Sequence, residues 1–87
     1  MKIKLLGSAI NAATSAASGA AFDGATLVYC INTNSASQLV TVCNSSNVTQ
    51  GSFYLGAGAS HMVVKEHADK VFAAHADVKL TPVAHHA

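Results

Sequence analysis

Apolar runs of strand length recur about every ten residues along this chain, and turns rich in Ser, Gly and Asn separate them. This spacing is typical of an all-β sandwich or a small barrel. The strands are expected at residues 2–6, 25–33, 38–44, 48–55, 61–66, 70–74 and 78–83. Because the connections are short, most pairings should be antiparallel. The pattern therefore predicts a small antiparallel β-sandwich or flattened barrel of about seven strands.

Several positions predict how individual strands are oriented. In the run 48–55, Phe53 and Leu55 share one face and Tyr54 takes the other, while Gly51 marks a bulge or bend. Pro82 has no N–H to donate to a ladder, so the last strand is expected at a sheet edge or near its own end.

The run 61–66 is expected to place Lys65 in solvent, which would turn Met62 and Val64 toward the core. The polar or glycine-marked turns at 34–37, 56–60 and 66–70 are expected to close hairpins between consecutive strands.

The segment 8–24 is rich in Ala and Ser and lacks an apolar stripe of helical period. We interpret it as a long loop after the first strand. It is an extended arm, an excursion between the two sheets, or a floppy surface loop, and a loop of this length is often functional. The first strand, at an edge, would be protected by its lysines. The residues expected to contact a neighbouring subunit are Lys2, Leu5, Ile10, Ala13, Ala17 and Phe22.

The chain has 87 residues, which corresponds to a single domain spanning 1–87. Charged residues make up 10% of it, against about 25% in a typical globular domain. Small neutral residues fill the difference, so the surface does little to repel other protein surfaces. This composition indicates either a low-charge proteome or a surface that partners cover.

The net charge of +1 and the absence of arginine argue against nucleic-acid binding, which requires a clustered basic face. No run approaches the ~20 apolar residues that span a membrane. The basic and apolar start resembles the beginning of a signal peptide, but Gly7 and Ser8 interrupt it at once. We therefore favour a protein that is not secreted.

Two cysteines, Cys30 and Cys43, fall on consecutive expected strands. If the turn 34–37 closes a hairpin, a register in which paired numbers sum to 73 would place them opposite each other, and a neighbouring register would place them on different faces. Buried free thiols are favoured over a disulfide in a protein assembled in the cytosol.

Histidine is the one conspicuous residue type with a chemical function. If 66–70 is a hairpin turn, His61 and His75 fall close to opposite each other and are weak candidates for a shared metal ion. No regular ligand spacing accompanies them, so exposed histidines without a ligand are the favoured interpretation. We expect no catalytic residues and no cofactor.

The stretch from Leu27 to Val83 resembles a type of small phage virion protein. The residues that carry the resemblance are 28–32 and 39–42, Gly51-Ser52-Phe53-Tyr54-Leu55 with the turn 56–60, Val63-Val64-Lys65, Asp69-Lys70-Val71-Phe72-Ala73 and Val78-Lys79-Leu80-Thr81-Pro82-Val83. The turn before Ser60 has Ala57-Gly58 where such proteins carry Pro-Gly. The resemblance implies an all-β module that decorates or cements phage heads, or one that belongs to the neck or tail.

These observations together predict a noncatalytic virion structural protein, first of all a capsid decoration or cement protein. Its partners would be the major capsid protein or neck and tail subunits, and it would be a homo-oligomer or bound to the lattice after assembly in the host cytoplasm. One alternative is a neck, tail or fibre component, or a surface-recognition module that binds a receptor or glycan. Another is a metal-dependent enzyme or sensor built on the histidines.

Overall fold

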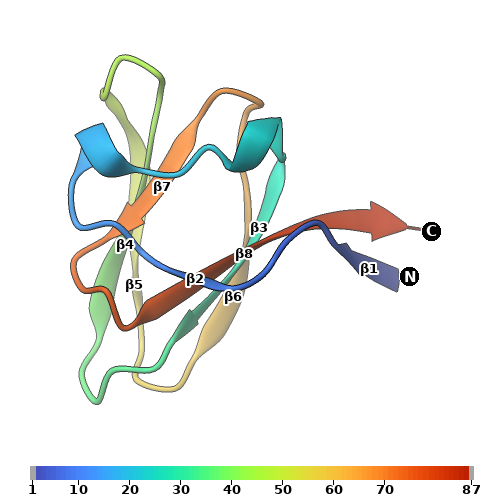
Figure 1. Ribbon diagram of the computed structural model, residues 1–87. Coiled ribbons are helices and arrows are strands. Elements are labelled where there is room, and N and C mark those ends of the chain that lie inside the picture. The colour runs from blue at the N-terminus through green and yellow to red at the C-terminus, as the bar shows by residue number, and fades with distance from the viewer. Residues whose placement is uncertain (1, 87) are drawn as a thin grey trace.

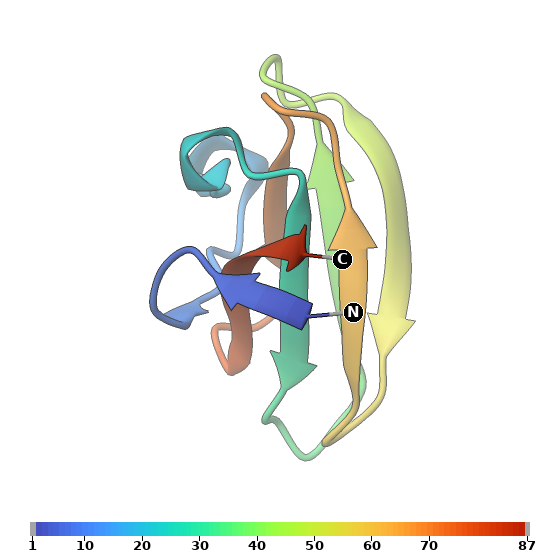
Figure 2. The ribbon, with the colours of Figure 1, turned by 90° about the vertical axis from the view of Figure 1, so that its right-hand side faces the viewer.

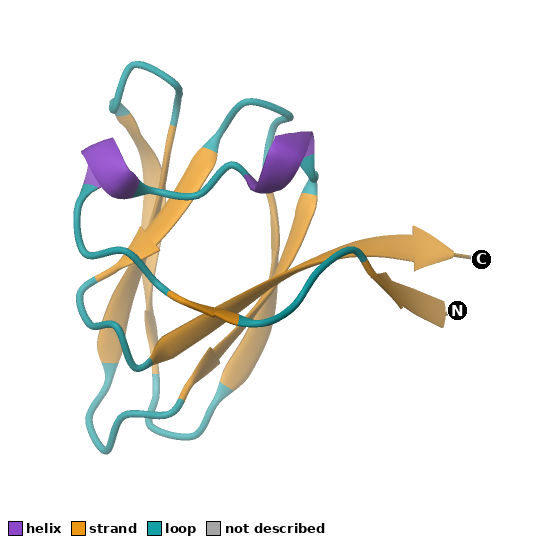
Figure 3. Ribbon diagram, viewed as in Figure 1, coloured by secondary structure: helices purple, strands orange, loops and turns teal. Residues whose placement is uncertain are grey.

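A computed structural model describes the backbone of residues 2–86 and the side chains of residues 5–22 and 24–84. This part of the chain is almost entirely strand and turn (Figure 3). The strands are β1 (Lys2–Leu5), β2 (Ile10–Asn11), β3 (Leu27–Asn32), β4 (Gln38–Cys43), β5 (Thr49–Leu55), β6 (Ser60–Val64), β7 (Lys70–Ala73) and β8 (Val78–His86). Two short 3-10 turns, η1 (Ala16–Ser18) and η2 (Phe22–Gly24), separate β2 from β3. Each of the expected strands is present, and the short β2 is an addition.

The strands form two antiparallel sheets that face each other (Figure 1). In sheet A the order is β1-β8-β3-β6, and β2 also pairs with β8. In sheet B the order is β5-β4-β7. The predicted small all-β sandwich is confirmed.

Alternating residues of the two inner faces fill the core. Fully buried side chains from sheet A meet fully buried side chains from sheet B, and a buried alanine from the segment between β2 and η1 joins them. These residues are Val28, Cys30, Val78 and Leu80 from sheet A, Val40, Val71 and Ala73 from sheet B, and Ala12. The alternation is the direct result of the period of two along a strand. On β5, Leu55 is buried, Phe53 is half-buried and Tyr54 is exposed, as the sequence predicts.

The expected hairpins at 34–37, 56–60 and 66–70 are wrong. The connections 33–37, 56–59 and 65–69 each carry the chain from one sheet to the other, whereas β4 and β5 do form a hairpin within sheet B. The same small polar residues suit both kinds of turn, so turn chemistry does not distinguish them. Consequently Cys30 and Cys43 lie in different sheets, and both are buried free thiols.

Pro82 does not mark a sheet edge, because β8 lies inside sheet A. On one side Pro82 is opposite Val28 of β3. On the other side β1 pairs with residues 83–86 and β2 with residues 79–80, so Pro82 falls in the break between them. The carbonyl of Pro82 accepts the Leu6 N–H there at 2.9 Å. A missing donor costs little at this gap, which explains how an interior strand tolerates a proline.

The expected orientation of β6 is also wrong. Val63 faces the core, Val64 is 80% exposed and Lys65 is only 5% exposed. The strand ends at Val64, and the Lys65 ammonium then donates to the carbonyl of Ala21 at 3.0 Å and to that of Glu66 at 3.3 Å. Backbone carbonyls therefore satisfy a lysine that its charge alone would place in solvent. A register shift after Val42 places the bulge of β5 beside Gly51.

Residues 8–24, which we call the arm, join an edge of sheet A to an edge of sheet B. The Ala12 N–H donates to the Val78 carbonyl at 2.8 Å, and the Ala73 N–H donates to the Ala13 carbonyl at 3.0 Å. Further along, Ala20 and Val71 exchange two hydrogen bonds as an isolated bridge. The arm thus covers the outer edge of β7 and one side of the sandwich.

Candidate functional site

The most prominent surface feature is a two-stranded ribbon that projects from the sandwich (Figures 1 and 2). It consists of β1 and the last residues of β8, with Leu5 opposite Val83. Among residues 2–86, no strand pairs with the other edge of β1. Leu5 is 69% exposed and Leu6, which follows it, is 49% exposed. Two adjacent exposed leucines beside an open strand edge are features of a protein-contact surface.

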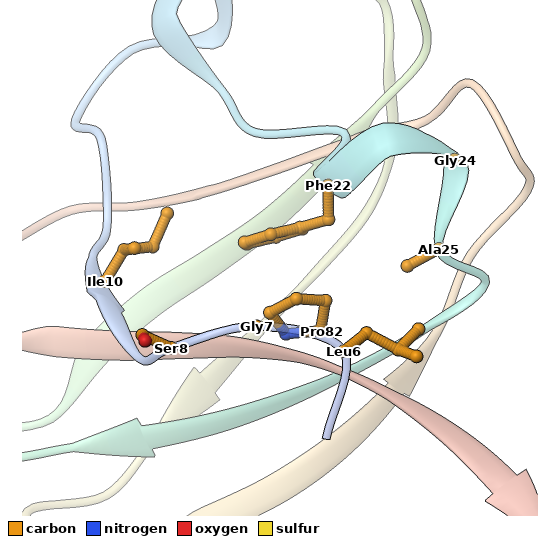
Figure 4. Close-up of a pocket in the computed structure, with 8 residues that line it drawn as sticks. All are labelled: Leu6, Gly7, Ser8, Ile10, Phe22, Gly24, Ala25 and Pro82. Atoms are coloured by element: carbon orange, nitrogen blue, oxygen red, sulfur yellow. The ribbon is translucent and has the colours of Figure 1, made fainter. Parts of the chain in front are cut away.

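An apolar groove of about 470 Å³ begins at the base of this ribbon (Figure 4). The Phe22 ring lies over the Pro82 ring, and Leu6 and Ile10 lie at the two ends of the groove. Gly7 lets the chain pass close to the proline, since an added Cβ would lie 3.3 Å from Pro82 Cγ. Leu6, which lines the groove, directly follows Leu5 of the ribbon, so the groove adjoins the ribbon.

The wall of the groove is held by an unusual backbone conformation. Phe22 has a φ of 56°, which is a strained region for a bulky side chain. Immediately before it, the carbonyl of Ala21 accepts a hydrogen bond from the Lys65 ammonium. Two residues after it, the carbonyl of Gly24 lies 3.1 Å from His67 Nδ1. Burial lowers the pKa of Lys65, and the Asp69 carboxylate opposes that shift. The connection 65–69 therefore positions Phe22.

The structure places the predicted interface residues in different surroundings. Ile10 and Phe22 meet in the groove, and Leu5 lies beside it on the ribbon. Ala17 is exposed on η1, whereas Ala13 is half-buried and its carbonyl is engaged by Ala73. The side chain of Lys2 lies outside the described residues. The sequence pattern missed Leu6 and Pro82, because neither one belongs to a long apolar run and only the fold brings them together.

The expected pairing of His61 with His75 is wrong. His61 lies opposite Cys30 in sheet A and packs edge-on against the Phe53 ring at 5.7 Å between centroids. His75 follows β7 of sheet B, and its Nδ1 accepts the Asp77 N–H at 3.0 Å. The chain changes sheets between the two histidines, so they are not neighbours. Among the side chains that the structure describes, no three His, Cys, Asp or Glu residues gather as a metal site would require.

The fold and surface define a small two-sheet β-sandwich with a projecting apolar ribbon. A comparison with protein-family models, curated proteins and solved structures finds no match to the chain. Between residues 2 and 86, no helix has the length and apolar character needed to cross a membrane.

Proposed function

We propose that this protein is a noncatalytic virion structural protein, a capsid decoration or cement protein that contacts neighbouring subunits through its ribbon and groove. The observation that carries the proposal is the projecting ribbon with its exposed Leu5 and Leu6. The unpaired edge of β1 can add to a strand of a neighbouring capsid subunit, so that backbone hydrogen bonds supply affinity.

The groove adds specificity to that contact. An apolar side chain of the neighbouring subunit that enters the groove would displace water from the half-buried Phe22 ring and from the exposed Leu6, beside the buried Pro82. Because the wall is fixed by Lys65 and His67, the groove is formed before binding, which lowers the entropy lost on association. Symmetric repetition over a particle then converts a weak contact into a large total stabilisation.

The test is binding to purified virus particles from the protein's own source, stripped of the protein and then mixed with it again. The wild-type chain should co-sediment at a fixed number of copies per particle. A double variant, Leu5→Asp with Leu6→Asp, should lose at least tenfold in affinity. Ala74→Asp with Ala76→Asp is the matched control, because both alanines are exposed but lie in the connection between β7 and β8, away from the ribbon (Figure 1). Absence of the native protein from purified particles, or equal binding by both variants, would contradict the proposal.

A further inference from the structure

The two long sides of the sandwich differ in whether another segment of the chain covers their strand edges. The arm closes the side where β8 and β7 lie, through hydrogen bonds to both sheets. On the opposite side β5 is the outer strand of sheet B and β6 the outer strand of sheet A (Figure 2). The contact between Phe53 and His61 shows that these two edges lie next to each other. Within the described residues, β5 pairs on one side only, with β4.

The edge of β5 lacks the charges that usually prevent strands of two molecules from pairing. Natural edge strands carry lysines or are covered by other segments. Here β1 contains two lysines and β7 is covered by the arm. In contrast, the chain has no Asp, Glu, Lys or Arg from Gly24 to Val64, so the whole of β5 is uncharged. The strand itself therefore brings no like charges into a contact between two copies, and the nearest charged residues, Lys65, Glu66 and Asp69, line the hollow beside Gly51.

The shape of β5 is complementary to itself about Ser52. Gly51 leaves open space, since an added Cβ would have no neighbour within 4 Å, and it borders a hollow of about 360 Å³. Phe53, on the other side of Ser52, is half-buried and projects on the same face as Gly51. Antiparallel pairing about a two-fold axis at Ser52 places each Phe53 opposite the Gly51 of the second copy. An aromatic ring beside a cross-strand glycine fills the space that the glycine leaves.

We propose that β5 is a self-association edge, through which two copies of this chain form an isologous dimer with Ser52 on the two-fold axis. The strand that pairs with β5 comes from a second copy of this chain, because β5 itself supplies both the glycine and the aromatic ring that must face each other. The pairing extends sheet B across the dimer and closes on itself, so it yields dimers and not fibres. A standard interface of about 800 Å² per partner would use about a sixth of the 4818 Å² surface. This dimer does not depend on the virion function proposed above.

Sedimentation velocity on the purified chain over a range of concentrations tests the dimer. The wild type should shift toward twice 8.8 kDa as concentration rises. Ser52→Lys places two like charges opposite each other and should raise the dissociation constant at least tenfold. Ser35→Lys is the matched control, because Ser35 is also an exposed serine but lies in the connection 33–37, and this variant should dimerise as the wild type does.

A second variant tests the register of the pairing and does not depend on weakening the dimer. With Ser52→Cys, the thiols of two copies meet at the axis and should form an intermolecular disulfide under mild oxidation. The native thiols are buried, and Ser35→Cys should remain uncrosslinked. Circular dichroism confirms that each variant is folded. A wild-type chain that stays monomeric, a dimer that Ser52→Lys leaves intact, or equal crosslinking of the two cysteine variants would each overturn the proposal.

Discussion

Replacing Asn32 with alanine should destabilise the sandwich more than any surface substitution of the same kind. Asn32 is fully buried at the end of β3. Its Nδ2 donates to the Leu55 carbonyl at 2.8 Å and to the Ala36 carbonyl at 2.9 Å, and its Oδ1 accepts the Asn34 N–H at 2.9 Å. One side chain therefore ties together two connections that cross between the sheets.

The size of the effect follows from those three bonds. The two part-buried bonds are worth about 1 kcal/mol each, and the buried Leu55 carbonyl that loses its donor costs about 1–3 kcal/mol. Asn32→Ala should thus lower the free energy of unfolding by about 3–5 kcal/mol. The whole domain is expected to have on the order of 4–13 kcal/mol. At about 4–8 °C per kcal/mol for a domain of this size, Tm should fall by at least about 12 °C.

Asn44→Ala is the matched control. The Asn44 Oδ1 also accepts two backbone N–H groups, from Ser46 at 2.9 Å and from Val48 at 3.0 Å, but in an exposed turn. Water can replace the lost bonds there, so the cost should stay near or below about 1 kcal/mol. Urea denaturation of the three proteins gives both differences directly. If Asn32→Ala costs no more than Asn44→Ala, burial is not what makes these bonds important and the reasoning fails.

Three further variants test other parts of the fold. Gly24→Ala should lower Tm more than Gly58→Ala does. Both glycines have positive φ, but a Cβ on Gly24 would lie 2.1 Å from the His67 ring, whereas a Cβ on Gly58 would meet open space. Equal losses of Tm would contradict this. Burial raises the pKa of the Cys30 thiol to about 12, above the ordinary value of 9.0, so the folded state retains a proton that the unfolded state loses. The free energy of unfolding should therefore fall as pH rises from about 9 to about 12, and Cys30→Ala should reduce that slope in urea titrations at each pH. Lys65→Met removes the donor to three backbone carbonyls and should lower the free energy of unfolding by about 1–2 kcal/mol, measured by urea denaturation at pH 7. An unchanged free energy of unfolding would show that water can replace the lysine at these carbonyls.

The recurrence of short apolar runs was sufficient to locate all the strands that the structure describes except β2, because a strand must bury apolar side chains on at least one face. It could not determine which strands are neighbours. A hairpin and a crossing between sheets use the same Asn, Ser and Gly residues, so the turn 34–37 carried no information about the partner of β3. The pairing of His61 with His75 failed for that reason alone.

At two individual residues, tertiary structure overrides a local sequence rule. Lys65 was assigned to solvent by its charge, but carbonyls from the arm and from the connection 65–69 surround its ammonium. Pro82 was assigned to an edge by its missing N–H, but the gap between β1 and β2 removes the need for that donor. Both exceptions depend on the arm and on the chain that leads into it, which have no periodic pattern from which their path could be predicted.

The two proposed contacts place different demands on one molecule, and the fold separates them. An isologous contact through β5 closes after two copies, so it cannot by itself attach the protein to a particle. The ribbon can do so, because β1 and β6 lie at opposite edges of sheet A and the β5 edge lies beside β6, away from the ribbon. A dimer would then present two ribbons to the particle, and the second would bind at a high effective concentration. Ser52→Lys should therefore weaken particle binding at low protein concentration, although Ser52 is remote from the ribbon, while Ser35→Lys should not. Unchanged particle binding by Ser52→Lys would show that each ribbon acts alone.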